Sequence, residues 1–276
     1  MDTTTYSALT RKSPPQVDGD QAGLISPAQD FGFRAVFLEE LADRCRALPG
    51  VTTLAVFGSA TAAGAYRRDA WSDVDFAVFA DPAAAEAVSA DWAFLPRPED
   101  LVLVAREYDS AGAALYADGT LAEFGAGVPW EVTDHTYEIL LGGGDLHVGP
   151  APVEPDPANA IRLFLVKLLV GVGRVRRGEV LAGGQHIRGQ ALSALAATLR
   201  QRVPPEVDTE PNPFDPLRRF DISYPELGRR LAAAVDRPAD AAGLALFEIA
   251  REVLEPGWPE FPTRAAEVIA RKLGWV

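Results

Sequence analysis

The chain has 276 residues, of which 48% are hydrophobic, and a net charge of −13 at pH 7. This length allows one large domain or two ordinary ones, and the hydrophobic share excludes a disordered chain. The acidic balance disfavours a nucleic-acid partner, because a negative surface repels phosphate backbones. It either attracts cationic small molecules or only keeps the protein soluble.

The sequence also restricts the compartment. The start of the chain contains no apolar stretch of signal-peptide length, and no later apolar run reaches the roughly 18 residues that a membrane span needs. The single cysteine, Cys45, excludes an intrachain disulfide and a cysteine-built zinc site. We therefore expect a cytoplasmic protein with no membrane partner.

The first half of the chain predicts a sheet-bearing domain. Residues 1–25 are polar and rich in Pro, Gly and Asp, which predicts a flexible tail. A helix is predicted over 27–48, where apolar residues recur at spacings of three and four, and an alanine-rich helix ends near residue 92. Strands are predicted at 53–57, 75–79, 101–104, 113–117 and 120–124. Asp118-Gly119 is a strong two-residue hairpin signal between the last two of them.

The second half predicts helices. The proline-rich stretch from Gly149 to Pro157 is the best candidate for a domain boundary, so we expect domains at 26–150 and 151–276. Asp156 has the position of a helix cap, and Gly178 that of a helix stop. Helices are predicted at 157–177, 185–202, 223–236, 239–254 and 262–273. The fold class is therefore α+β, with the sheet first and a helical bundle second.

Two acids, Asp73 and Asp75, open the strand predicted at 75–79. Side chains at i and i+2 of a strand share a face, so the two carboxylates would lie close together. At that separation they repel each other unless a cation or a shared proton lies between them. Mg²⁺ is the usual hard cation for oxygen ligands. Glu123 lies on a strand expected to be a neighbour and supplies a third acid. An ordinary surface turn is the alternative for Asp73-x-Asp75, and an exposed edge strand is the alternative for Glu123.

A Gly-Ser pair, Gly58-Ser59, ends the strand predicted before the acids. Backbone N–H groups at a glycine can approach a phosphate closely, and a short helix from about Ala60 would direct its positive end to the same anion. The alternatives are purely structural roles: a tight turn for Gly58 and a helix cap for Ser59. A phosphate site next to paired metal acids implies nucleotidyl transfer with Mg²⁺.

Together these residues resemble a known family. An apolar strand, Gly58-Ser59, a spacer and then Asp73-x-Asp75 resemble the signature of the nucleotidyltransferase superfamily typified by DNA polymerase beta, with a spacer on the long side. The rest of the chain resembles the antibiotic-modifying branch of that superfamily, the aminoglycoside and lincosamide nucleotidyltransferases. The resemblance implies a minimal polymerase-beta-like domain, with a mixed sheet flanked by helices, followed by a C-terminal helical bundle. The motif covers residues 50–125, and the helical half is similar in architecture only.

The resemblance implies a Mg²⁺-dependent adenylyltransferase that uses ATP or another nucleoside triphosphate. The acceptor would be a hydroxyl of a small molecule, with a cationic aminoglycoside-type antibiotic favoured, and pyrophosphate would be released. By position, Gly58 and Ser59 would hold the triphosphate and Asp73 and Asp75 would bind Mg²⁺. Glu123 would be the third metal ligand, the general base, or both.

Several basic and acidic residues have two interpretations each. Lys167, on an otherwise apolar helix, could reach a β- or γ-phosphate or could snorkel to solvent. Arg67 and Arg68 could neutralise phosphate or belong to a solvated loop. A set of residues that follows the third acid in sequence could shape the acceptor pocket or form a charged helix face. These residues are Trp130, Glu131, Asp134 and Glu138.

Alternative functions keep part of this chemistry. The acceptor could be a lincosamide, another metabolite or a protein side chain. A function of another class is a non-catalytic nucleotide-binding module that acts as a regulator or antitoxin-like partner, and the presence of all three acids argues against it. In related enzymes a homodimer can complete the site, and the sequence leaves that assembly open.

Overall fold

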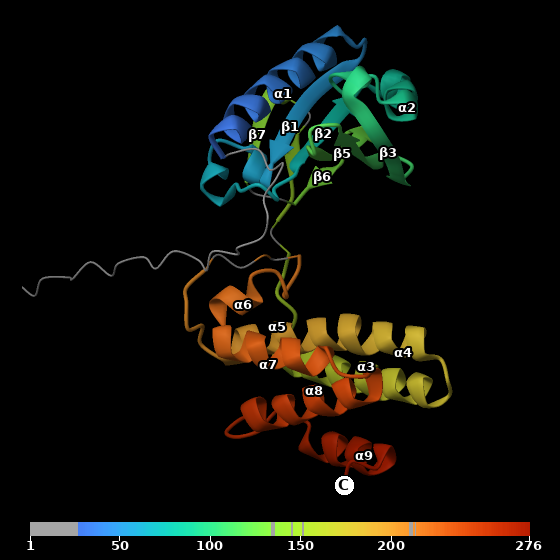
Figure 1. The fold of residues 1–276 in the computed structure, drawn as a ribbon, viewed down its shortest axis with the longest axis vertical. Coiled ribbons are helices and arrows are strands. Elements are labelled where there is room, and N and C mark those ends of the chain that lie inside the picture. The colour runs from blue at the N-terminus through green and yellow to red at the C-terminus, as the bar shows by residue number, and fades with distance from the viewer. Residues whose placement is uncertain (1–26, 134–135, 145, 151, 210–211, 213) are drawn as a thin grey trace, which may run out of the picture. The chain divides into compact units, whose positions relative to one another are not determined.

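The computed structural model describes residues 27–133, 136–144, 146–150, 152–209, 212 and 214–276 (Figure 1). The tail predicted at 1–25 lies outside these residues, as does Asp134. One compact unit ends at Gly149, and a second begins at Pro150. Among the described residues, no helix is both long enough and apolar enough to span a membrane.

The first unit is built on a six-stranded mixed sheet with the strand order β3-β4-β5-β2-β1-β7. The strands are β1 (Val51–Phe57), β2 (Val74–Ala80), β3 (Leu101–Tyr108), β4 (Ala111–Tyr116), β5 (Leu121–Gly127) and β7 (Tyr137–Gly142). Neighbouring strands are antiparallel except β2 and β5, which are parallel. Short strands β6 (Glu131–Val132) and β8 (His147–Val148) pair separately.

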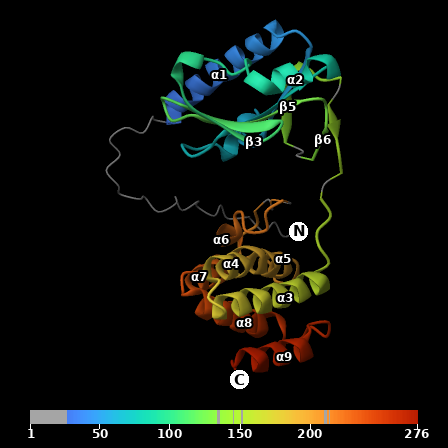
Figure 2. The same cartoon turned by 90° about the vertical axis from the view of Figure 1, so that its right-hand side faces the viewer.

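Two helices, α1 (Pro27–Ala47) and α2 (Pro82–Asp91), cover one face of this sheet (Figure 2). α1 packs against β1 and β7, and α2 packs against β2 and β5. Between helices and sheet lies an apolar core in which the rings of Phe76 and Phe124 stack with centroids 5.4 Å apart. Because side chains alternate along a strand, the residues beside these phenylalanines in sequence face the opposite side of the sheet.

The hairpin predicted at Asp118-Gly119 is confirmed. Gly119 has φ +88°, its N–H donates to Tyr116 O (2.9 Å), and an Asp118 carboxylate oxygen accepts from Thr120 N (2.9 Å). The resulting β4–β5 hairpin brings Glu123 into the middle of the sheet, directly opposite Ala113. Glu123 is therefore not on an edge strand, because β3 and β7 form the two edges.

The strand β7 was not predicted. Its sequence, YEILLG, is a short apolar run without alternation, which is compatible with either a helix or a strand. Pairing with β1 makes this segment a strand rather than a helix and places Glu138 opposite Val56. The expectation that Glu138 belongs to a charged helix face is therefore wrong. β3 is also longer than predicted, since it extends from Leu101 to Tyr108.

The second unit is helical. Its elements are α3 (Pro157–Arg176), α4 (Val180–Gln185), a π-helical turn (His186–Ala191), α5 (Leu192–Arg202), α6 (Phe220–Ser223), α7 (Pro225–Val235), α8 (Ala239–Leu254) and α9 (Thr263–Leu273). Asp156 caps α3 as predicted, because its carboxylate accepts from Ala158 N (3.3 Å) and Asn159 N (3.1 Å). The predicted fold class, a mixed sheet flanked by helices and followed by a helical region, is confirmed.

The helix predicted to start at residue 185 begins instead at Val180. Gly183-Gly184, inside this helix, has low helix propensity. Packing overrides that propensity, since a Cβ at Gly183 would lie 2.6 Å from the carbonyl oxygen of Gly171 in α3. The glycines permit close contact between α3 and α4 rather than a break.

Candidate functional site

The three predicted acids come together on the face of the sheet that α1 and α2 leave uncovered. Asp73 precedes β2, Asp75 is its second residue, and Glu123 is on β5. Asp75 and Glu123 are direct register partners in the parallel pair. Each acid offers one oxygen, and these three oxygens lie within 4.8 Å of one another.

Local sequence explains why the acids share this face. Val74 and Phe76 alternate with Asp75, as Ala122 and Phe124 alternate with Glu123, and all four apolar side chains are buried in the core beneath α1 and α2. Burying them directs the two carboxylates to the other side. Asp73 and Asp75 are half-buried there, and Glu123 is exposed.

The electrostatics of the cluster favour a cation. The pKa of Glu123 is raised, first by partial desolvation of its carboxylate, although the residue as a whole is exposed, and then by the negative charges of Asp73 and Glu107. A bound cation would relieve this repulsion. The donor set consists of carboxylate oxygens, which is the chemistry that Mg²⁺ prefers, so the residues present fit such an ion.

The Gly58 turn lies directly beside the acids. Gly58 has φ +54°, and a Cβ at that residue would be 3.9 Å from the nearer oxygen of Asp75. The residues Gly58–Ala60 form a 3₁₀ turn, so the helical turn begins at Gly58 and not at the predicted Ala60. The N–H of Gly58 donates to Thr136 O (2.8 Å), and the N–H of Thr61 donates to Gly58 O (3.3 Å).

The loop after this turn is held by contacts that the sequence did not reveal. The buried Thr61 hydroxyl donates to Gly58 O (2.9 Å) and accepts from Gly64 N (2.9 Å). From β7, the carboxylate of Glu138 accepts from Ala62 N (2.8 Å). Glu138 therefore anchors the loop, and only its pairing with β1 could have indicated this.

Arg68 was predicted either to neutralise phosphate or to belong to a solvated loop. In the structure its guanidinium lies against the same turn, where it donates to the carbonyl oxygens of Ser59, Ala60 and Thr61. Arg67, its neighbour, lies over the ring of the exposed Tyr66. Arg68 is therefore bound to the turn through three carbonyl groups.

Of the residues predicted to shape an acceptor pocket, Trp130 lies on the acid-bearing face. Its ring packs edge-to-face on Phe79 with centroids 4.5 Å apart, and a Cβ at Gly125 would lie 2.7 Å from it. Gly125 is two residues from Glu123 and therefore faces the same side. Trp130 thus forms a wall on this face, beyond the acids.

Lys167 is on α3 in the second unit, where it is half-buried. Its proposed contact with phosphate stays a prediction.

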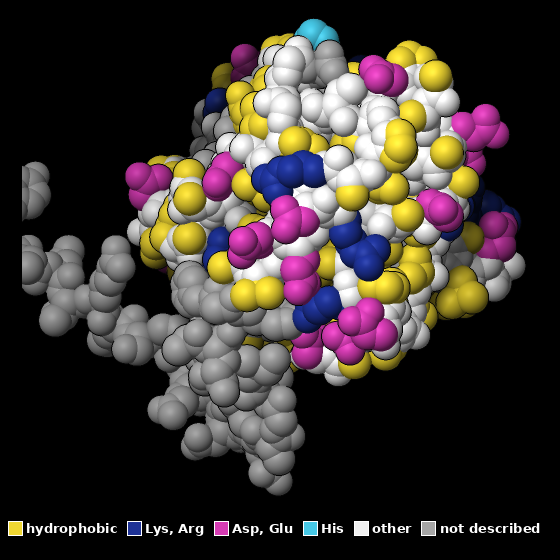
Figure 3. Space-filling model, turned by 90° about the horizontal axis from the view of Figure 1, so that it is seen from above, with side chains coloured by type: hydrophobic (Ala, Val, Ile, Leu, Met, Phe, Trp, Pro, Cys, Tyr) yellow, Lys and Arg dark blue, Asp and Glu magenta, His cyan; other side chains and the backbone are white. Residues whose placement is uncertain are grey.

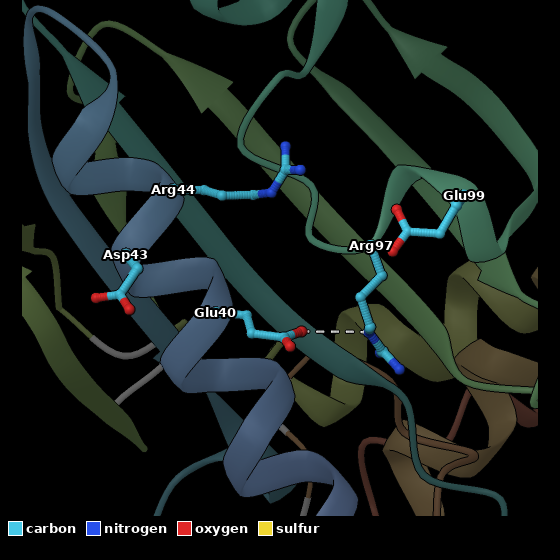
Figure 4. A pocket seen from close by; sticks show the side chains of 5 residues that line it. All are labelled: Glu40, Asp43, Arg44, Arg97 and Glu99. Atoms are coloured by element: carbon cyan, nitrogen blue, oxygen red, sulfur yellow. Dashed lines mark ion pairs between the residues drawn. The ribbon is translucent and has the colours of Figure 1, made fainter.

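A polar hollow of about 330 Å³ lies elsewhere in the first unit, between α1 and the segment before β3 (Figure 4). It is lined by Glu40, Asp43, Arg44, Arg97 and Glu99. Arg97 pairs with Glu40 (3.3 Å) and with Asp118 (3.5 Å), so these charges tie α1 to the sheet. The surface seen in Figure 3 likewise has basic and acidic side chains interspersed. We assign this hollow a structural role.

No protein-family model matches the chain, and no curated protein matches it. Among solved structures, the chain is similar to the crystal structure of an aminoglycoside 6-adenyltransferase from Bacillus subtilis. The two are 11% identical, and the match covers 88% of this chain and 97% of that chain with a TM-score of 0.34. A likeness at this level assigns neither a family nor an activity.

Proposed function

We propose that the protein is a nucleotidyltransferase that moves a nucleoside monophosphate from a nucleoside triphosphate to a hydroxyl group of a small molecule. One observation carries the proposal: Asp73, Asp75 and Glu123 gather their oxygens within 4.8 Å of one another, beside the Gly58 turn. A cation site of carboxylates next to a glycine turn suits a triphosphate with its metal.

The acids would hold Mg²⁺. When bound, the ion supplies positive charge that offsets the charge of the triphosphate and of the leaving group. Asp73 and Asp75 act as ligands. Glu123 acts as a third ligand, as the group that takes the proton of the acceptor hydroxyl, or as both. Its raised pKa suits proton transfer, because a base is most effective when its pKa is close to the working pH.

In the reaction, the acceptor oxygen forms a bond to the α-phosphorus while the bond from that phosphorus to the oxygen bridging to the β-phosphate breaks. Pyrophosphate leaves with the electrons of the broken bond, and the hydroxyl proton passes to a carboxylate. The turn binds the triphosphate through the N–H groups of Ser59 and Ala60 and the hydroxyl of Ser59, while Gly58 supplies the backbone conformation.

The finer assignments rest on the resemblance and on charge. We propose ATP as the nucleotide and an aminoglycoside-type compound as the acceptor, because the net charge of −13 favours a cationic acceptor. A lincosamide, another metabolite or a protein side chain would be served by the same acids.

Pyrophosphate release tests the proposal. The purified protein is incubated with Mg²⁺, each of the four nucleoside triphosphates and a panel of cationic and neutral acceptors. We expect acceptor-dependent release that Asp73→Asn and Asp75→Asn each lower by more than about a hundredfold, as is typical when a group that stabilises the transition state is lost. Glu86→Gln, which removes an exposed charge from α2, should leave the rate unchanged.

Two results would contradict the proposal. In one, the asparagine variants release pyrophosphate at the rate of the unsubstituted protein. In the other, the protein binds ATP but releases no pyrophosphate with any acceptor, which would favour the non-catalytic nucleotide-binding module. Thermal unfolding of each variant, compared with that of Glu86→Gln, separates loss of activity from loss of fold.

A further inference from the structure

Arg68 contacts three consecutive carbonyl groups of the turn beside the acids. Its Nε donates to Ser59 O at 2.8 Å, and one terminal nitrogen donates to Ala60 O at 3.2 Å and to Thr61 O at 3.3 Å. Arg68 is half-buried, so these hydrogen bonds are partly shielded from water. The contact joins the end of the loop, shortly before Asp73, to its beginning, shortly after β1.

The planarity of the peptide bond gives this contact a directional consequence. In each peptide unit the C=O and the N–H of the next residue point in opposite directions in one plane. When Arg68 holds the carbonyl of Ser59, it therefore also fixes the direction of the Ala60 N–H. The Thr61–Ala62 unit is held at both ends, because Arg68 binds its C=O and Glu138 accepts from its N–H.

An arginine suits this position better than a lysine. The guanidinium is planar and carries five N–H donors in a fixed arrangement, so it can bind adjacent carbonyls together. A lysine keeps the charge but offers a single nitrogen. If the charge alone acted on phosphate, a lysine would serve as well, and this difference separates the two roles.

We propose that Arg68 is a positioning residue that sets the triphosphate-binding turn in the orientation needed for nucleotide binding. This inference rests on the proposed function. It predicts that losing the guanidinium mainly weakens nucleotide binding, because the turn must then be ordered at the expense of binding energy. Asp75 and Glu123 lie on paired strands, so we expect the rate at saturating nucleotide to change less.

The test compares Arg68→Met and Arg68→Lys with Arg106→Met as a matched control. Arg106 also donates three hydrogen bonds to carbonyls, to Asp109 O (2.7 Å), Ser89 O (2.9 Å) and Ala90 O (3.0 Å). It does so beside α2, on the helix-covered side of the sheet. The control therefore removes the same kind of contact from the same unit without touching the turn.

We expect Arg68→Met to raise the KM for the nucleotide about tenfold with less than a threefold change in kcat. Amide hydrogen exchange of residues 59–62 in the free protein should become faster. In Arg68→Lys, the KM and the amide exchange rates should remain different from those of the unsubstituted protein. Arg106→Met should change neither the KM nor these exchange rates. If Arg68→Lys restores the KM and the exchange of these amides is unaltered, Arg68 acts by charge on the phosphate and the inference is wrong. An unchanged KM in a folded Arg68→Met variant would also overturn it.

Failure of the proposed function would look different. If the unsubstituted protein releases no pyrophosphate with any nucleotide, the inference is judged by exchange alone, with magnesium tripolyphosphate as the probe. It holds if the probe slows exchange of amides 59–62 in the unsubstituted protein and in Arg106→Met but not in Arg68→Met. It fails if the probe gives no protection or protects the Arg68 variant equally.

Discussion

Gly64 lies so close to Gly58 that no side chain fits between them. A Cβ at Gly64 would be 1.9 Å from the carbonyl oxygen of Gly58 and 2.8 Å from its carbonyl carbon. Gly64 has an ordinary φ of −86°, so the requirement is for space and not for an unusual backbone conformation. Any larger residue must displace the Gly58 peptide, which lies beside Asp75.

We therefore predict that Gly64→Ala lowers kcat/KM for the nucleotide at least about tenfold, because small displacements of positioned groups are costly in catalysis. Gly144→Ala is the matched control, since a Cβ at Gly144 would meet nothing within 4 Å. Steady-state pyrophosphate release measures both variants. Equal kcat/KM values for the two would show that the turn tolerates displacement.

Glu138 provides a second test of the loop. Its carboxylate accepts from the Ala62 N–H, so Glu138→Ala leaves that donor without its partner. We predict that the free energy of nucleotide binding becomes less favourable by about 1 kcal/mol, which corresponds to roughly a fivefold rise in the KM for the nucleotide. Glu138→Gln keeps an acceptor oxygen and should retain most of the affinity. If the alanine and glutamine variants are indistinguishable, the hydrogen bond does not support the turn.

Signals close together in the sequence predicted most of the frame that holds the acids. Asp73-x-Asp75 at a strand start and the Asp118-Gly119 turn predicted β2 and the β4–β5 hairpin, because alternation and hairpin geometry are local rules. The Asp156 cap was readable for the same reason: its acceptors and donors lie within three residues. The parallel pairing of β2 with β5, which makes Asp75 and Glu123 register partners, is a long-range contact that these local signals do not determine.

The supports of the turn could not be read in this way. Glu138 contacts Ala62 across 76 residues of sequence, and the contact exists only because β7 pairs with β1. Arg68 is near the turn in sequence, but a solvated arginine and one that binds three carbonyls look the same in a sequence. The start of α4 was misplaced because the requirement for Gly183 comes from Gly171 in another helix.

Cys45 tests the packing of α1 against the sheet. Its side chain is fully buried, and burial raises the pKa of the thiol to about 12. Thiol reagents attack the thiolate, which is both scarce and inaccessible here. We predict that a disulfide reagent at pH 8 labels the folded protein more than about a hundredfold slower than the denatured chain, where one thiol per chain should react. Rapid labelling of the folded protein would contradict the described position of α1.

The stability of the protein should depend on pH through Glu123. Its pKa in the folded state is raised above the usual value, so the folded protein holds this proton more tightly than the unfolded chain. As the pH rises from the usual carboxyl value through the raised one, the unfolded state loses the proton first. The contribution of Glu123 to the free energy of unfolding therefore falls across this window. Glu123→Gln should remove that fall in thermal unfolding measured without metal.

Mg²⁺ should reverse this effect if the three acids bind it. The ion binds the deprotonated carboxylates of the folded protein, so it should raise the unfolding temperature, and more at pH 7.5 than at pH 5, where protons compete for Glu123. Glu123→Gln should reduce the gain and its pH dependence, while Glu86→Gln should preserve both. A gain that is equal at the two pH values, or equal in Glu123→Gln and the unsubstituted protein, would mean that the ion binds at a site without Glu123.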